Sequence, residues 1–493
     1  MLQEIMQVHP SISLMLCLRY LFFLLPVLLI LPGLVSCAST EPPPPPVAEA
    51  GPGVLPPAEP PPPEEPPPRP TMESVLAEIA AFLEKGDFEG AVALFDTLDA
   101  ADAALVPVRL LKASVLSSWG KFAESRALVD EILAGEPQNT EALFVLAALT
   151  AAGGKEREQR AILEGIIKID PAHAGALSSL GTIALRNRSF KNAASYFDRV
   201  LALEPENREA LIGRAGVFRY TRDPKNAEAL LNKAISLYPQ WVAPLSERAR
   251  LYRDAGRLAR ALADLDAAKN LNSRDYWIHY DRGNVLLDLN RKKEALEEFT
   301  QAIALDPDNF VAYIYSAGIQ DELGNFEGAE RDYTALIRLN PEYYFAYEGL
   351  GMLKMRKKQW AEARDAFLEA YRYAPQESSY ALLAAMSWMR AGKIGDPRQF
   401  LEQALRRVQR ETLEWYMFRL YHDLAGDNDV AIRIDQEKNS DIKSRMLFYL
   451  ANYYDIRGNT ALAARYFLLI KELGRRGIIE WRLSEWIFED RNL

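Results

Sequence analysis

The sequence predicts an all-α protein, a solenoid built from helical hairpins. Prolines recur at intervals of thirty-four residues through the middle of the chain, with one serine in their place: Pro137, Pro171, Pro205, Pro239, Ser273, Pro307, Pro341 and Pro375. Apolar residues between them return at three- and four-residue steps, the spacing of one helix face. A fixed period of this length is typical of stacked two-helix units, which bind partners along an extended surface.

The segment 174–207 illustrates one unit. Its first half carries Leu177, Leu180 and Ala184 on one predicted helix face, and a polar stretch at 187–189 then interrupts the pattern. A second apolar face follows and ends before Pro205, because proline cannot continue a helix. Two helices of about a dozen residues joined by a short turn form an antiparallel hairpin.

The residues at fixed places in these units resemble the tetratricopeptide repeat (TPR). In the unit from Ala174 the matching residues are Gly181, Ala193, Phe197 and Pro205, and in the unit from Tyr276 they are Gly283, Ala295, Phe299, Ala302 and Pro307. Small residues allow the two helices to approach closely, and the aromatic residue fills the space to the next hairpin. The resemblance implies a right-handed superhelical solenoid of about twelve TPR hairpins.

The array is predicted over 72–475 and is least regular at its ends. Asp396 and Pro397 stand where a second helix would already be running, so we expect that helix to begin late and to be short. The next unit is expected to be about two residues short, since Gly458 comes early. Residues 476–493 are predicted to form a capping helix with an apolar face of Trp481, Leu483, Trp486 and Ile487.

A targeting segment precedes the array. Residues 21–34 are almost wholly apolar, which is short for a membrane span, and Leu34-Val35-Ser36-Cys37 closes them. This ending resembles the lipobox of bacterial lipoproteins, so 1–36 is predicted as a lipoprotein signal peptide and Cys37 as the lipidated residue. A start at Met15 would leave a more typical leader and is favoured over Met1. The alternative is an ordinary cleaved signal peptide with an incidental cysteine.

Residues 37–71 are predicted as a disordered, proline-rich tether that begins with the lipidated cysteine. Sixteen of the thirty residues 41–70 are proline, which excludes helix and sheet and favours extended polyproline II. At about 3.1 Å per residue such a spacer reaches roughly 90 Å. The same prolines could instead be a ligand for an aromatic groove.

Charge and motifs argue against several functions. The net charge of −10 is unsuited to a nucleic-acid partner. The four histidines are scattered, and the sequence shows no zinc motif, phosphate loop or nucleophile elbow. We therefore expect no enzyme activity, catalytic residue, metal, cofactor or small-molecule substrate.

The TPR resemblance places a partner-binding groove on the first helix of each hairpin. The residues predicted to line it are Arg250, Arg253, Trp277, Tyr280, Asn284, Ile314, Tyr315, Phe345, Glu348 and Met352. Aromatic residues and arginine dominate the binding energy of many interfaces, and the resemblance implies that Asn284 holds a peptide backbone. The alternative is that these side chains pack between adjacent hairpins.

Together these features predict a membrane-anchored TPR scaffold lipoprotein of the bacterial cell envelope. Its partners would be protein or peptide segments, with outer-membrane sorting favoured because Ala38 follows the cysteine. Lipoproteins that assemble cell-wall, pilus or outer-membrane machinery are the nearest functional resemblance. The alternative is a surface-exposed adhesin that binds host or extracellular partners.

Overall fold

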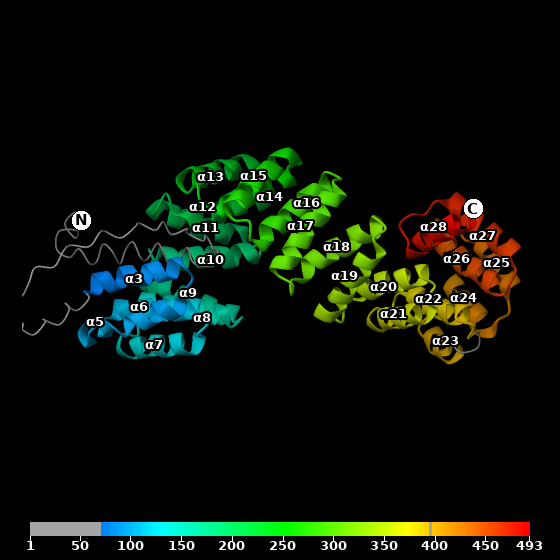
Figure 1. The fold of residues 1–493 in the computed structure, drawn as a ribbon, viewed down its shortest axis with the longest axis horizontal. Helices are drawn as coiled ribbons and strands as arrows, with labels where there is room; N and C mark the ends of the chain where they lie inside the picture. The colour runs from blue at the N-terminus through cyan, green and yellow to red at the C-terminus, as the bar shows by residue number, and fades with distance from the viewer. Residues whose placement is uncertain (1–70, 394–396) are drawn as a thin grey trace, which may run out of the picture. The chain divides into compact units, whose positions relative to one another are not determined.

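The computed structural model describes residues 71–393 and 397–493 (Figure 1). This part of the chain contains twenty-six α-helices and no β-strand, so the predicted all-α fold is confirmed. The predicted signal peptide, Cys37 and the tether lie outside the described residues, apart from Thr71, whose hydroxyl caps the first described helix at Ser74 N.

The helices follow one another as twelve pairs, with a five-residue helix α5 (Ala100–Ala104) and a final helix α28 (Ile479–Arg491) outside the pairing. The first helices of the pairs are α3 (Met72–Glu84), α6 (Val106–Ser118), α8 (Thr140–Ala152), α10 (Ala174–Arg186), α12 (Arg208–Tyr220), α14 (Val242–Asp254), α16 (Tyr276–Asp288), α18 (Phe310–Glu322), α20 (Tyr344–Arg356), α22 (Ser378–Arg390), α24 (Leu413–Asp423) and α26 (Ser440–Ile456). The second helices are α4 (Phe88–Phe95), α7 (Phe122–Gly135), α9 (Glu156–Ile169), α11 (Phe190–Leu203), α13 (Pro224–Leu237), α15 (Leu258–Leu271), α17 (Lys292–Leu305), α19 (Phe326–Leu339), α21 (Trp360–Tyr373), α23 (Arg398–Leu405), α25 (Asp427–Gln436) and α27 (Thr460–Leu473).

The recurring prolines belong to a repeated turn between hairpins. At Pro205 the chain leaves α11, and Asn207 accepts a hydrogen bond from Ala210 N at 2.9 Å, capping α12. The amide of Asn207 also donates to Glu204 at 2.8 Å. Asn139 makes the same pair of contacts, and Asn309 donates to Asp306 and accepts from Val311 N, two residues later. The proline therefore ends one helix while the asparagine two residues later starts the next.

The backbone conformation of the turn inside each hairpin also repeats every thirty-four residues. A residue with positive φ stands at each turn, and from Gly86 to Gly392 these residues keep the period without a slip. Most are glycine, but Arg188, Arg222, Asn290 and Lys358 adopt the same left-handed conformation, which costs a residue with a Cβ about 1 kcal/mol.

Close packing explains the small residues and the aromatic of each unit. The ring of Phe197 is fully buried between Gly181 of its own hairpin and Gly213 of the next. A Cβ added at Gly213 would lie 2.2 Å from Phe197 Cζ, far inside van der Waals contact. The aromatic thus joins adjacent hairpins, as the sequence predicted.

The described chain forms two compact units, one ending at Leu251 and the other beginning at Tyr252, within α14. In the first unit, a series of small apolar clusters each joins neighbouring hairpins, as between α3, α4 and α6 or between α10, α11 and α12. Each hairpin therefore depends mainly on its immediate neighbours, the property of a solenoid.

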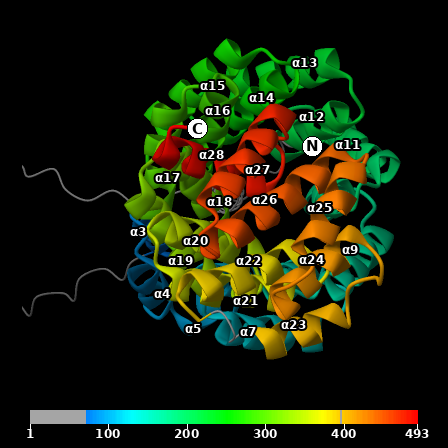
Figure 2. The same cartoon turned by 90° about the vertical axis from the view of Figure 1, so that its right-hand side faces the viewer.

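The second unit ends differently. Buried residues from Met352 to Phe488 form one continuous core, and Figure 2 views this end of the chain with α26, α27 and α28 toward the reader. The late and short second helix predicted after Pro397 is α23, with eight residues. Pro397 lies at its N-cap instead of the predicted N1, and Asp396 lies outside the described residues.

The predicted short unit is also present, since α24 and α25 have eleven and ten residues. The paired array ends at Leu473, two residues before the predicted limit. No helix in the described residues is both long and apolar enough to span a membrane.

Candidate functional site

The first helices of three consecutive hairpins in the second unit, α16, α18 and α20, carry most of the predicted groove residues. Two of these side chains are half-exposed aromatics: Trp277 on α16, with 52% of its surface open to solvent, and Phe345 on α20, with 50%. Both stand at the second position of their helix, directly after the residue that begins it. Exposed large aromatics at equivalent places of a repeat are the residues available to a partner.

Trp277 rests on a set of aromatic rings. Its ring meets Tyr276 edge-on at a centroid distance of 5.0 Å and Tyr280 at 5.6 Å. Tyr280 in turn packs at 5.8 Å against Tyr315 of α18, which stacks on the buried Phe299. These contacts hold the exposed indole on a rigid base, so little side-chain entropy would be lost when a partner binds.

Other predicted site residues support this surface instead of forming it. Asn284 is only 2% exposed, and its amide donates to the Tyr280 carbonyl at 2.9 Å. Met352 is buried in the core of the C-terminal hairpins. In this arrangement neither presents its side chain to a peptide, because Asn284 bonds within its own helix. Ile314 and Tyr315 are half-buried and pack between hairpins.

The two predicted arginines are engaged in ion pairs. Arg250 belongs to the first unit and bonds to Glu247 at 2.6 Å, one turn earlier in α14. Arg253 pairs with Asp288 of α16 at 2.5 Å. Both contacts lie at half-exposed side chains, where such pairs contribute little to stability.

Buried carboxyl groups lie along the first helices next to the aromatics. Glu348 of α20 accepts a hydrogen bond from the Tyr380 hydroxyl, and burial raises the pKa of Glu348. Asp321 at the end of α18 is fully buried at its side chain, and burial raises its pKa as well, despite the guanidinium of Arg482. Burial thus favours the neutral form of both carboxyl groups.

A buried charge cluster joins α15, α16 and α17. Glu298 contacts His279 Nδ1 at 2.7 Å and Lys269 Nζ at 3.0 Å, and it also pairs with Arg282. Burial alone would raise the pKa of Glu298, but these hydrogen bonds and charges bring it down to about 2. His279 Nε2 meets the Ser273 carbonyl at 2.9 Å. Because each member already bonds to another member, the cluster links the three helices to one another.

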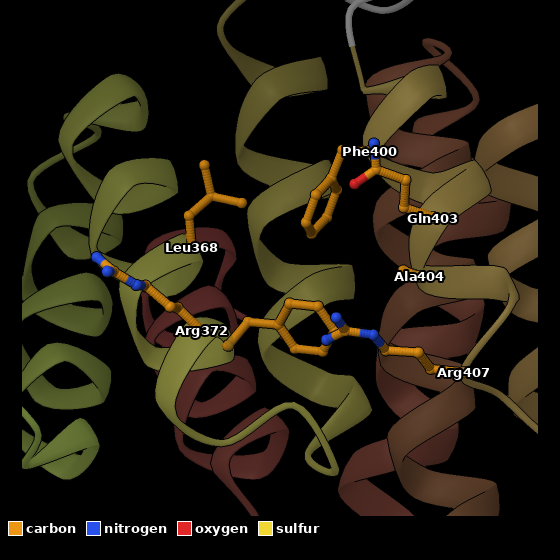
Figure 3. A pocket seen from close by; sticks show the side chains of 7 residues that line it. Leu368, Arg372, Phe400, Gln403, Ala404 and Arg407 are labelled. Carbon is orange, nitrogen blue, oxygen red and sulfur yellow. The ribbon is translucent and has the colours of Figure 1, made fainter.

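A shallow pocket of about 220 Å³ lies between α21 and α23. Figure 3 shows Leu368 and Arg372 on one side and Phe400, Gln403, Ala404 and Arg407 on the other. The Arg407 guanidinium lies 5.8 Å from the Tyr371 ring. No charged group is buried there to orient a ligand, so the pocket is a gap between packed side chains. The described residues also hold no group of three metal-type ligands.

The sequence pattern missed the place of the last helix. α28 forms the predicted amphipathic helix, but its buried side includes Glu480 and Ser484 as well as Trp481, Leu483 and Phe488. It contacts α20 and α26 in addition to α27. No pattern of apolar residues within 476–493 could have revealed this, because one partner of Glu480, Ser379 of α22, lies 101 residues earlier in the chain.

The fold defines a class, the proteins built from repeated helical hairpins. Three segments match models of the tetratricopeptide repeat, over residues 179–240, 276–309 and 319–378. These segments of the chain are tetratricopeptide repeats. No curated protein matches it.

Three of the solved structures that are similar to this chain are the following. A tetratricopeptide repeat protein from Parabacteroides merdae is 21% identical, with 50% of this chain and 98% of that one covered and a TM-score of 0.41. PilF of Pseudomonas aeruginosa is 19% identical, with 42% and 93% covered and a TM-score of 0.37. Human IFIT1 is 16% identical, with 81% and 90% covered and a TM-score of 0.44. No function is taken from likenesses this distant.

The TPR array makes the chain a scaffold for protein–protein interactions. Repeat proteins of this kind are generally not enzymes.

Proposed function

We propose that this protein is a lipid-anchored TPR scaffold of a bacterial cell envelope, which captures a segment of a partner protein on the first helices α16, α18 and α20. The proposed lipid anchor and location are supported by the run Leu34-Val35-Ser36-Cys37 directly after an apolar leader. The observation that supports capture is the half-exposed pair Trp277 and Phe345 on a rigid aromatic base.

The chemistry of the surface indicates the kind of segment. Exposed aromatic rings favour apolar and cationic side chains. The partner segment would therefore combine large apolar residues with arginine or lysine.

The capture surface can be tested by photo-crosslinking in intact cells. A crosslinking amino acid at position 277 or 345 is expected to join the protein to the same partner. Position 122, where Phe122 is also exposed but lies in the first unit, is the matched control. Equal labelling of that partner from all three positions would contradict the proposal.

With the partner identified, the double variant Trp277→Ala and Phe345→Ala is expected to weaken binding at least about thirty-fold, since truncating an interface hot spot costs about 2 kcal/mol or more. The melting temperature should stay unchanged because both rings are half-exposed. If binding falls only together with the melting temperature, the two rings serve packing.

The anchor is tested by Cys37→Ser. Without the thiol no diacylglycerol can be attached, so the protein is expected to move from the membrane fraction to the soluble fraction after cell disruption. Ser36→Ala is the matched control, since alanine is another small residue before the cysteine. Membrane association of the Cys37→Ser variant would reject lipidation as the anchor.

A further inference from the structure

The last helix of the chain lies on the same kind of surface that TPR proteins offer to partners. α28 contacts first helices of several hairpins, not only the hairpin it follows. Its side chains reach α18 at Asp321, α20 at Arg356, α22 at Ser379 and α26 at Tyr449. In Figure 1 α28 lies beside α26 and α27 at the C-terminal end. These contacts therefore extend beyond the last hairpin, which α26 and α27 form.

The first turn of α28 is held by a buried carboxylate. Glu480, 1% exposed, accepts hydrogen bonds at Oε1 from the Ser379 hydroxyl at 2.6 Å and the Tyr449 hydroxyl at 2.7 Å. Tyr449 OH also lies 3.2 Å from the Ser379 carbonyl. Two first helices, α22 and α26, thus form a polar receptor for one side chain of α28.

Opposite charges fix the rest of the helix. Arg482 pairs with the buried Asp321 at 2.5 Å, and Arg491 pairs with Asp455 at 2.7 Å. At the C-terminal end Arg356 bonds to Glu489 at 3.2 Å, and its guanidinium lies 5.5 Å from the Trp486 ring. Each pair joins α28 to a different helix, so the contact is specific in register.

This contact is less well satisfied than the rest of the fold. Eight buried side-chain polar atoms in the described residues lack a hydrogen-bond partner. Five of them belong to α28, to α26 or to Asp321, which pairs with Arg482: Asp321 Oδ1, Ser444 Oγ, Arg445 Nε, Glu480 Oε2 and Trp481 Nε1. A buried polar atom without a partner is unfavourable, so the contact between α28 and its receptor is incompletely satisfied by these side chains.

The connection to α28 allows it to leave. The segment between α27 and α28 contains Gly474, with φ of +62°, and Gly477. Both glycines are exposed, and a Cβ at either would meet nothing within 4 Å. Neighbouring atoms therefore do not restrict the conformation of the connection at these two glycines.

We propose that α28 is an internal ligand of the first-helix face of the second unit, and that an amphipathic helix of a partner protein replaces it. The partner helix would carry a carboxylate for Ser379 and Tyr449, an arginine two residues later for Asp321, and large apolar residues between and beyond them. This inference rests on the proposed role of the first helices in partner capture. It adds that the face is occupied until a competing helix displaces α28.

The test uses the full chain with a protease site inserted between Arg475 and Arg476. After folding, the chain is cut, and a fluorescent peptide of residues 478–493 is added. The peptide is expected to exchange into the cut protein, and to bind the uncut protein at least about ten-fold more weakly, because tethered α28 competes at millimolar effective concentration. A peptide with Arg482→Glu should bind the cut protein at least about ten-fold more weakly than the wild-type peptide.

Asp321→Asn in the receptor is expected to weaken exchange, whereas the matched change Asp441→Asn should not, because Asp441 pairs with Arg475 outside the α28 contact. If circular dichroism shows that the cut protein loses helix content, the experiment uses uncut protein with Arg482→Glu in place of the cut protein. This variant should bind the wild-type peptide more tightly than unaltered protein does.

Two results would overturn the inference. If excess peptide displaces no α28 from the cut protein, and the Arg482→Glu protein binds none, α28 is a permanent cap. If light scattering shows dimers that exchange α28 between copies, the occupant is a second copy of this chain. Failed exchange with intact crosslinking at position 277 would reject only this inference. Successful exchange without crosslinking at 277 would reject the aromatic capture surface.

Discussion

At the scale of single residues, contacts between aromatic rings and glycines join the two helices of a hairpin and, at Gly213, one hairpin to the next. Phe197 is buried against Gly181 and Gly213, Phe299 against Gly283, and Phe367 against Gly351. A ring fills the space that a missing Cβ leaves open, so glycine and aromatic must be present together. These glycines are required for their small size, and their helical backbone needs no positive φ.

Gly213→Ala is therefore expected to destabilise the protein by about 1–3 kcal/mol, because the added methyl group overlaps the buried Phe197 ring. Gly165→Ala is the matched control, since Gly165 also lies inside a helix but faces open space. It should stabilise by about 0.5–1 kcal/mol. Urea unfolding of both variants checks the prediction, and equal effects would show that the Phe197 contact is not tight.

The residue scale also shows how far site prediction reached. Trp277 and Phe345 could be predicted as partner-facing from the repeat position, and their half-exposure is compatible with that prediction, which still awaits a binding experiment. Asn284 and Met352 occupy equally favourable positions in the repeat, yet both are buried. The repeat pattern specifies which helix a residue belongs to, but not how deeply its neighbours cover it.

At the scale of elements, the turn between hairpins repeats with a proline, and at Ser273 a serine stands in the place of that proline. The residue before each turn proline is extended: Asp306 has φ −139° and ψ 84°, and Asn340 has φ −142° and ψ 92°. Asn272, before Ser273, has φ −146° and ψ 97°. The backbone at Ser273 thus already has the conformation that a proline requires of its predecessor.

Ser273→Pro is expected to stabilise the protein by about 0.4–1 kcal/mol, by reducing the freedom of the unfolded chain. The carbonyl that meets His279 is kept. Asn272→Pro is the matched control and should destabilise by more than about 1 kcal/mol, because the Asn272 N–H donates to Ala268 at 2.9 Å. Thermal unfolding of both variants tests these two expectations. A lower melting temperature for Ser273→Pro would contradict the interpretation of the turn.

The irregular helices near the C-terminus share one large apolar core. Pro397 lies at the N-cap of α23, which has eight residues, and α24 and α25 have eleven and ten. Their apolar residues merge into the single core that extends from Met352 to Phe488. The sequence predicted where the thirty-four-residue spacing is lost, and the structure shows one larger core in that region.

At the scale of the whole molecule, the proposed scaffold and the alternative adhesin differ in which side of the outer membrane the array faces. Protease added to intact cells is expected to leave the array uncut, and permeabilisation should expose it, because a periplasmic array is shielded by the membrane. Immunoblotting against the array is the measurement, with a known surface protein as the control. Cleavage without permeabilisation would favour the adhesin.

The sequence by itself determined the helices, their pairing and the turns that separate them. These depend on local chemistry, such as the proline that ends α11, the asparagine that caps α12 and the apolar spacing of one helix face. Only the tertiary structure decided which residues are buried on the first-helix face and where α28 lies. Those outcomes depend on contacts such as Arg356 with Trp486, 130 residues apart in the chain, which no local pattern records.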